Sequence, residues 1–338
     1  MSHVTIEPLH GKYDLAEGPH WDHVSKKLYY VDIFAQKIYR YDPSTKTLTS
    51  TFVRMYLKCY FLYYSYTILI VTFLLISENG PVGVAVPVDG AHDKLVVASG
   101  NDILLVSWDG EKDLAKCPTQ TLASIESKST ETRFNDGKVD SSGRFWCGTM
   151  GFLKDGNFPP NVGSFYCMNK DLQLKKEISP VTISNGLAWS LNDDILYYID
   201  STTYQIVAFD YNSQTGAISN KRTVFDVQKN NIDGLPDGMT IDSCGNLWVA
   251  LYGGNGVIEI NPKTGELLRY IKINTAKNIT SVMFGGDNLD ILYVTSACTG
   301  LSEDELKEQP HAGYLFAIKG LGVRGLPANS FKLSDKLM

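Results

Sequence analysis

The sequence lacks the cysteine spacing of a metal or redox motif. Its six cysteines are scattered over 338 residues, without a CxxC pair or a neighbouring histidine partner. This distribution excludes zinc ribbons and CxxC redox motifs, so the thiols are expected to be buried side chains. A GxSxG motif, which would mark a serine nucleophile at a strand-to-helix turn, is also missing.

Basic charge is scarce as well. The chain has 31 lysines and arginines against 37 aspartates and glutamates, a net charge of -6 and a pI near 5.5. A nucleic-acid partner would require a basic surface, so we expect a small substrate or a cation instead. The first residues, MSHVTIEPLHGKYD, lack a basic patch followed by an apolar stretch, and so do not resemble a secretory signal. We therefore expect a cytoplasmic protein.

Helical periodicity is almost absent. The segment 301–309, with SEDELKEQP at its heart, is the one stretch that predicts a short helix. A TIM barrel needs long helices between its strands, so this shortage argues against that fold. A two-sheet sandwich would not explain the regular repeat that the sequence contains.

The repeat is marked by six strand-like segments, which begin at Lys27, Lys94, Arg144, Ile195, Asn246 and Ile291. They are 45 to 67 residues apart, and most continue into another strand and a turn rich in Asp, Asn, Pro and Gly. Such repeats predict an all-β fold, a six-bladed β-propeller with four-stranded blades. We expect a single domain over residues 1–338, with the terminal strands near 4–9 and 330–334 pairing to close the ring.

One atypical hydrophobic insertion, at about 55–77, lengthens the first repeat. Cys59 to Ser77 is 19 residues without a charge, which by length qualifies as a transmembrane candidate. A spanning helix there would separate the first blade from the other five and prevent ring closure. We therefore favour a translated intron or gene-model artefact, with a hydrophobic loop that anchors the propeller on a membrane as the second interpretation. A membrane partner is expected only if the segment is genuine.

The inner strand of each repeat opens at the mouth of the expected central channel. The residues at these openings are Glu17, Val82, Asn135 or Asp136, Asn185, Asp237 and Thr280. Carboxylate and amide oxygens are the ligands that a hard divalent cation prefers. Each Asp-Gly or Asn-Gly pair alone is an ordinary turn signal, and for Asp136 a turn role is the prediction. Their recurrence at equivalent positions favours one cation site, and Glu17 supports it most because Glu has no special turn role.

Longer motifs surround these openings. They are EGPHW at Glu17, RFNDGKVD at Arg133, SNGLAWS at Ser184, PDGMTID at Pro236 and FGG at Phe284. In these motifs the chain resembles the regucalcin, or senescence marker protein, family of gluconolactonases, over nearly its whole length except Met55 to Ser77.

The resemblance implies a six-bladed propeller in which Glu17, Asn185 and Asp237 are metal ligands. It also implies that Asp237 is the catalytic base and that Arg133 and Asn135 contact the substrate. Family members carry an acidic substrate-contacting residue shortly after a Gly-Thr-Met motif. Here Gly148-Thr149-Met150 is followed by Gly151, Phe152 and Leu153, a departure that bears on the preference for sugar lactones.

The predicted function is a metal-dependent hydrolase that opens sugar-type lactones, with one divalent metal ion (Ca, Zn, Mg or Mn). The cation would polarise the lactone carbonyl while a carboxylate such as Asp237 helps a water attack, so a covalent nucleophile is not needed. The fork of donors on Arg133 could orient the substrate, although an ion pair at the core edge is an alternative for this residue. A calcium-binding regulator without turnover remains an alternative. So does a hydrolase of another small lactone, ester or nitrile, as luciferin-regenerating relatives suggest.

Overall fold

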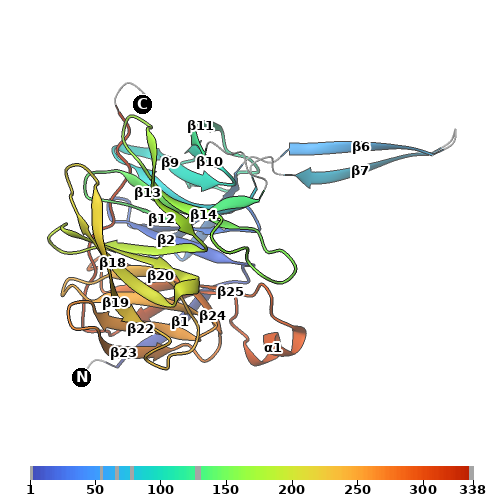
Figure 1. The fold of residues 1–338 in the computed structure, drawn as a ribbon. Coiled ribbons are helices and arrows are strands. Elements are labelled where there is room, and N and C mark those ends of the chain that lie inside the picture. The colour runs from blue at the N-terminus through green and yellow to red at the C-terminus, as the bar shows by residue number, and fades with distance from the viewer. Residues whose placement is uncertain (1–2, 54–55, 65–67, 77–79, 126–130, 335–338) are drawn as a thin grey trace.

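The computed structural model describes residues 3–53, 56–64, 68–76, 80–125 and 131–334. Its strands form six antiparallel sheets of four strands each, and these follow one another in chain order from blue to red in Figure 1. The innermost strands of the six sheets contact one another in sequence and so form a ring. The predicted six-bladed β-propeller with four-stranded blades is confirmed.

The six inner strands are β2 (Ala16–Asp22), β8 (Val82–Val88), β12 (Thr132–Val139), β16 (Ser184–Trp189), β20 (Leu235–Ile241) and β24 (Asn278–Gly285). Outside them, blades one to three add β3 (Lys27–Asp32), β4 (Lys37–Asp42) and β5 (Thr47–Phe52); β9 (Ala91–Ser99), β10 (Asp102–Ser107) and β11 (Thr119–Ser124); and β13 (Phe145–Gly151), β14 (Gly163–Met168) and β15 (Leu174–Val181). Blades four to six add β17 (Ile195–Asp200), β18 (Gln205–Tyr211) and β19 (Ile218–Asp226); β21 (Leu247–Tyr252), β22 (Gly256–Asn261) and β23 (Glu266–Lys272); and β25 (Ile291–Ala297), β26 (Leu315–Lys319) and β1 (Thr5–His10).

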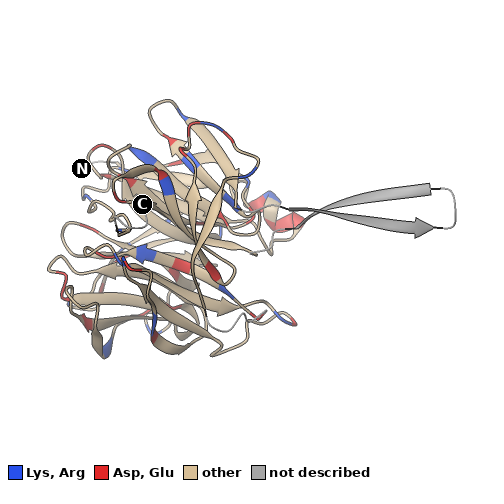
Figure 2. Cartoon of the chain, turned by 90° about the horizontal axis from the view of Figure 1, so that it is seen from above, with Lys and Arg blue, Asp and Glu red and all other residues tan. Residues whose placement is uncertain are grey.

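Burial decreases from the inner to the outer strand of a blade. Every residue of β8 and β24 is buried, whereas β15 and β23 expose most of their side chains. This gradient follows from the sequence, because the inner strands carry apolar and small residues and the outer strands carry Lys, Glu and Thr. Figure 2 shows Lys and Arg interspersed with Asp and Glu, with neither sign gathered on one part of the view.

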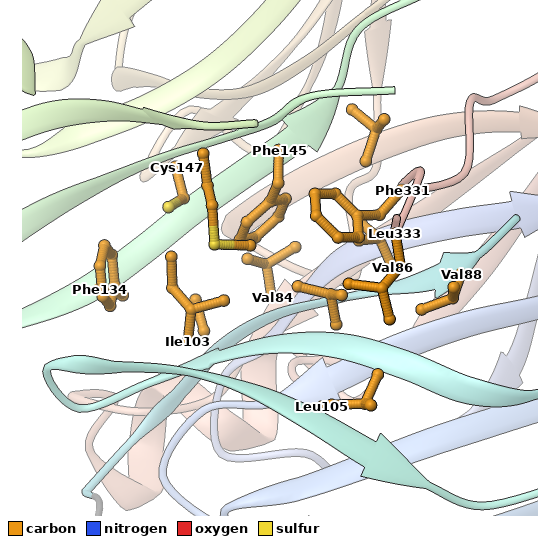
Figure 3. Close-up of a cluster of buried hydrophobic side chains, with 14 of the residues drawn as sticks. Val84, Val86, Val88, Ile103, Leu105, Phe134, Phe145, Cys147, Phe331 and Leu333 are labelled. Carbon is orange, nitrogen blue, oxygen red and sulfur yellow. The ribbon is translucent and has the colours of Figure 1, made fainter. Parts of the chain in front are cut away.

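The core is divided among the blade interfaces. Six clusters of buried hydrophobic residues each join two neighbouring blades. Figure 3 shows the cluster between blades two and three, where Val84 and Ile103 meet Phe134 and Phe145. Each blade is therefore held on both sides, and this circular packing fixes the positions at which the inner strands open.

The prediction that the two terminal strands pair with each other is wrong. The amino-terminal strand β1 pairs with β26 and completes the sixth blade. The carboxyl-terminal segment instead crosses the far end of the ring: the Ser243 amide donates to the Arg324 carbonyl (2.8 Å) and the Phe331 amide to the Pro87 carbonyl (2.9 Å). Phe331 forms a parallel β-bridge with Val88 and is fully buried in the cluster between blades two and three, so contacts with blade two and not with the amino-terminal strand set its place.

Residues 326–329 of this segment also line a cavity at that end of the channel. The cavity has a volume of about 190 Å³, and Lys138 and Met283 lie on its wall opposite Leu326 and Ala328. The inner strands end here, so the openings of those strands lie at the opposite end of the ring, which we call the mouth.

The hydrophobic insertion does not form the helix that its length allows. Its described residues form two strands, β6 (Tyr56–Tyr64) and β7 (Ile68–Ile76), which pair as a separate hairpin that points away from the blades in Figure 1. Parts of the predicted insertion and its flanks lie outside the described part of the chain, namely residues 54–55, 65–67 and 77–79. Among the described residues, no helix is long and apolar enough to cross a membrane.

The short helix predicted at 301–309 is confirmed as α1 (Glu303–Glu308). It begins with a capping box, in which the Glu305 amide donates to the Ser302 hydroxyl and the Ser302 amide donates to the Glu305 carboxylate. A 3-10 turn, η1 (Ser201–Thr203), follows β17 in the fourth blade.

Candidate functional site

All six inner strands carry a β-bulge near the residue that opens them. The pairing register shifts by one residue between Glu17 and His20, Val82 and Val84, Phe134 and Gly137, Ser184 and Leu187, Pro236 and Met239, and Ile279 and Ser281. A bulge bends a strand and changes the direction of its side chains. The Asp-Gly and Asn-Gly pairs are therefore parts of bulges inside strands, and the turn role predicted for Asp136 is wrong.

The glycines of these pairs allow the inner strands to approach one another closely. A Cβ atom on Gly186 would lie 2.5 Å from the carbonyl oxygen of Asp237, and one on Gly83 would lie 2.1 Å from that of Asn135. Both distances are too short for a side chain, so the second residue of the pair is glycine because the next blade occupies its space. This close approach brings the polar residues of separate blades together at the mouth.

A chain of hydrogen bonds links blades three and four. Arg133 Nη1 donates to Asn135 Oδ1 at 2.8 Å, and Asn135 Nδ2 donates to the Ser184 carbonyl at 3.0 Å and to Asn185 Oδ1 at 3.4 Å. The Asn185 amide nitrogen donates in turn to the Ser201 hydroxyl of η1 at 2.8 Å. These bonds fix the orientation of both amides, and they leave Asn185 with its oxygen toward Asn135.

Three carboxylates are buried at this end of the channel. Glu17, Asp136 and Asp237 are 4, 6 and 6% exposed. Burial, followed by repulsion from Asp136, raises the pKa of Glu17 to about 8, although the Gly18 amide donates to its Oε2 at 2.8 Å. Burial also raises the pKa of Asp136, and burial together with the charges of Glu17 and Asp136 raises the pKa of Asp237 well above its ordinary value. Proximity of like charges and desolvation both disfavour ionisation here.

Two cationic side chains act on these carboxylates: Arg133 near Glu17 and Asp237, and Lys138, which also lines the cavity at the far end, near Asp136. Burial lowers the pKa of Arg133 to about 10, opposed by the charges of Glu17 and Asp237. Burial lowers the pKa of Lys138 to about 8, opposed by Asp136, and its ammonium group donates to the Met239 carbonyl at 2.6 Å. Three acids against two bases leave the cluster one positive charge short when all are ionised, and the Asp237 Oδ1 atom has no hydrogen-bond partner within the described chain.

Sequence reasoning missed Lys138 as a member of this cluster, and it named Asp136 only as an alternative to Asn135 at the third opening. Asp136 was assigned to a turn because Asp-Gly is a common turn pair. Lys138 could have been found, since residues two apart in a strand share one face and Asp136 lies on the channel side.

Two of the six openings bring no free oxygen to the mouth. Val82 packs in the hydrophobic cluster between blades one and two. The Thr280 hydroxyl is fully buried; it donates to the Ala16 carbonyl (2.6 Å) and accepts from the Thr295 hydroxyl (2.8 Å), so it ties blade six to blade one. The expectation that these two residues face the mouth is not supported by their contacts.

Glu17, Asn185 and Asp237 carry the oxygen atoms that a hard divalent cation prefers as ligands. Among the described residues, no three His, Cys, Asp and Glu side chains gather in a group that could hold a metal. A cation at this place would therefore use the Asn185 amide oxygen besides the carboxylates of Glu17 and Asp237. The unpartnered Asp237 oxygen and the missing positive charge are what such an ion would satisfy.

The raised pKa of Glu17 predicts a pH dependence of stability for the metal-free protein. A carboxyl group whose pKa is raised on folding stabilises the folded state fully below its ordinary value of 4.5, and this contribution is lost as the pH rises through about 8. In chelator, we expect Tm to fall between pH 5 and pH 8.5, and Glu17→Gln to remove roughly 5 °C of that fall. Scanning calorimetry at several pH values measures it. Glu266→Gln, at an exposed position of β23, is the matched control, and identical slopes for Glu17→Gln and the wild type would contradict the prediction.

The chain is similar to known proteins over nearly its whole length. Residues 15–298 match the family model described as the SMP-30/Gluconolactonase/LRE-like region. Regucalcin of Xenopus laevis is 38% identical over 334 residues, which cover 98% of this chain and 99% of that protein. The solved structure of a luciferin-regenerating enzyme is 34% identical, with a TM-score of 0.85 over 98% of this chain and 100% of that one.

A more distant structure shows the same fold. It is described as a calcium-binding protein, regucalcin, from Agrobacterium tumefaciens, and it is 20% identical with a TM-score of 0.78 over 98% of this chain and 97% of that one. The chain belongs to the SMP-30/gluconolactonase/LRE-like family.

Proposed function

We propose that this protein is a cytoplasmic, metal-dependent hydrolase that opens small lactones, with the sugar-type lactones of a gluconolactonase as the first class to test. The observation that supports it most is the buried, unpartnered Oδ1 of Asp237 beside two further buried carboxylates. Family membership supports the hydrolase class, because gluconolactonase is part of the family's description.

In this proposal Glu17, Asn185 and Asp237 hold one divalent cation, which when bound polarises the lactone carbonyl. The Gly18 amide fixes one Glu17 oxygen, and Ser201 fixes the Asn185 amide, so both oxygens are oriented before an ion arrives. Preoriented ligands of this kind bind without reorganisation at the moment of reaction.

The other residues act on the substrate and on water. Asp237 Oδ1 accepts a proton from the attacking water, and burial, which raises the pKa of Asp237 in the metal-free protein, supports its role as a proton acceptor. The water oxygen bonds to the acyl carbon, the ring C–O bond breaks, and the ring oxygen takes up the proton that Asp237 accepted from the water. Arg133 and Asn135 bind the substrate on the blade-three side, and the bond between them holds the guanidinium plane in place.

Hydrolysis of a different small lactone, ester or nitrile is a second candidate. The loop after Gly151 begins with Phe152 and Leu153, which are 38 and 60% exposed, where an acidic residue would suit a sugar. The relative named luciferin-regenerating enzyme, at 34% identity, supports the same candidate. A calcium-binding regulator is a third, and the name of the Agrobacterium structure supports it.

Turnover of a lactone panel tests the proposal. The purified protein is incubated with Ca²⁺, Zn²⁺, Mg²⁺ or Mn²⁺ in turn, and acid release is followed for D-glucono-δ-lactone, dihydrocoumarin and a nitrophenyl ester. Turnover of a lactone with at least one of these ions supports the hydrolase. Turnover of the ester alone would favour the second candidate. Calcium binding in calorimetry without turnover of any substrate would overturn the hydrolase in favour of the regulator.

A further inference from the structure

Phe34 is an exposed aromatic residue at the mouth of the channel. It follows β3, which pairs with the opening of β2, and 45% of its surface is exposed. The turn that carries it is fixed by the buried Asp32, whose carboxylate accepts from the amides of Asp14 (3.0 Å) and Ala35 (3.3 Å). The exposed ring is therefore held on an ordered turn and not on a free loop.

The ring of Phe34 lies beside the buried guanidinium of Arg133. The Arg133 Cζ atom is 5.9 Å from the ring centroid, which is within range of a cation–π contact. Arg133 belongs to blade three and Phe34 to blade one, so the arginine reaches across blade two. It can do so because blade two opens with Val82 and Gly83, which bring no polar or bulky group to the mouth. A substrate bound by Arg133 must consequently lie against Phe34.

The loop after β13 adds further apolar surface at the same end of the ring. Gly151 pairs with Thr132, the residue before Arg133, and the Phe152 amide donates to the Glu131 carbonyl at 3.1 Å. The exposed apolar side chains of this loop are Phe152, Leu153, Phe158 and Val162.

The charged residues of that loop lie at its tip. Lys154 and Asn157 exchange backbone hydrogen bonds of 2.8 and 2.9 Å, so Asp155 sits in the turn that they close. The loop returns toward the ring, since a Cβ atom on Gly151 would lie 2.4 Å from Pro159. The part of the loop next to the strand is thus apolar, and the carboxylate is at the turn.

From this geometry we infer that the substrate carries an apolar, preferably aromatic, group next to its reacting carbonyl, and that Phe34 is the residue that selects it. The inference rests on the proposed hydrolase and names its substrate class. A polyhydroxylated ring would bring hydroxyl groups against Phe34, whose ring face does not form the hydrogen bonds that a polar side chain would. A fused aromatic ring would instead bury apolar surface against Phe34.

Two six-membered lactones separate the classes, because they share the reacting group and differ in their periphery. We expect kcat/KM for dihydrocoumarin to exceed that for D-glucono-δ-lactone by about tenfold or more. Phe34→Ala should raise KM for dihydrocoumarin about tenfold, while kcat for dihydrocoumarin changes less than twofold. For the sugar lactone, both kcat and KM should change less than twofold. Phe34→Leu, which keeps an apolar side chain, should restore most of the loss.

Val24→Ala is the matched control, since Val24 is 65% exposed in the turn at the other end of β2 and β3. It should leave both substrates unchanged. A preference for the sugar lactone, or an equal effect of Phe34→Ala on both lactones, would overturn the inference and leave the hydrolase standing. If the wild type turned over neither lactone with any of the four ions, the proposed function would fail, and the inference with it.

Discussion

Replacing Asp237 by asparagine is expected to lower kcat for lactone hydrolysis about a thousandfold, because the variant loses the proposed base and one anionic metal ligand together. General base catalysis alone contributes a factor of about 10² to 10⁴. Asparagine keeps the size of the side chain and can still accept a hydrogen bond, so the buried site should remain filled. The charge and the proton acceptor are what the substitution removes.

The measurement is steady-state kinetics at saturating metal, which separates kcat from KM. Asp233→Asn is the matched control, since Asp233 is an exposed residue of the connection that leads into β20, four positions before Asp237. It should keep kcat within twofold. Should Asp237→Asn retain kcat within threefold of the wild type, while its circular dichroism spectrum is unchanged, Asp237 would not be the base.

Removal of the divalent cation is expected to lower kcat at least about a hundredfold, and addition of the ion should restore it. Without it, only Arg133 and Lys138 offset the charges of three buried carboxylates, whose pKa values burial raises. Both cations are also fixed in place, because Arg133 Nη1 donates to Asn135 and the Lys138 ammonium donates to the Met239 carbonyl. A metal's contribution to transition-state stabilisation is several kcal/mol, so the loss should be large.

The experiment follows turnover during titration with a chelator and then with each cation. Chelator already saturated with Ca²⁺ serves as the control for effects of the chelator itself, and it should not inhibit. Full activity after exhaustive chelation, with metal content below one-tenth of the protein concentration by elemental analysis, would refute the metal-dependent mechanism.

The propeller and most of the mouth could be predicted from the sequence because the repeat is regular. Once six units are aligned, Glu17, Asn185 and Asp237 occupy the same position in different blades, and a closed ring must bring that position together. Arg133 and Asn135 belong to the same opening, and the structure links them by a hydrogen bond. Their roles in binding stay predictions.

Other features depend on contacts that no local pattern encodes. Bulges displace the side chains at each opening, so Asp136 enters the channel although Asp-Gly predicts a turn. Thr280 has the correct position in the repeat, yet its hydroxyl bonds to the Ala16 carbonyl of the neighbouring blade. Ring closure was mispredicted for a similar reason: the segment around Phe331 alternates like a strand but is held in the core between blades two and three.

Phe34 illustrates the same limit at the mouth. In the sequence it is one apolar residue in a turn, and its significance comes from the Arg133 side chain that reaches it from another blade. Aligning the repeats cannot reveal this contact between blades one and three, because the alignment places each residue only within its own blade.

Anomalous diffraction from crystals grown with Mn²⁺ tests the central claim most directly, which is that residues of three blades hold one cation. We predict a single strong peak at the mouth, within about 2.6 Å of a Glu17 oxygen, the Asn185 Oδ1 atom and an Asp237 oxygen. A well-ordered crystal with saturating Mn²⁺ and no peak there, or with a peak bound by other residues, would contradict the account.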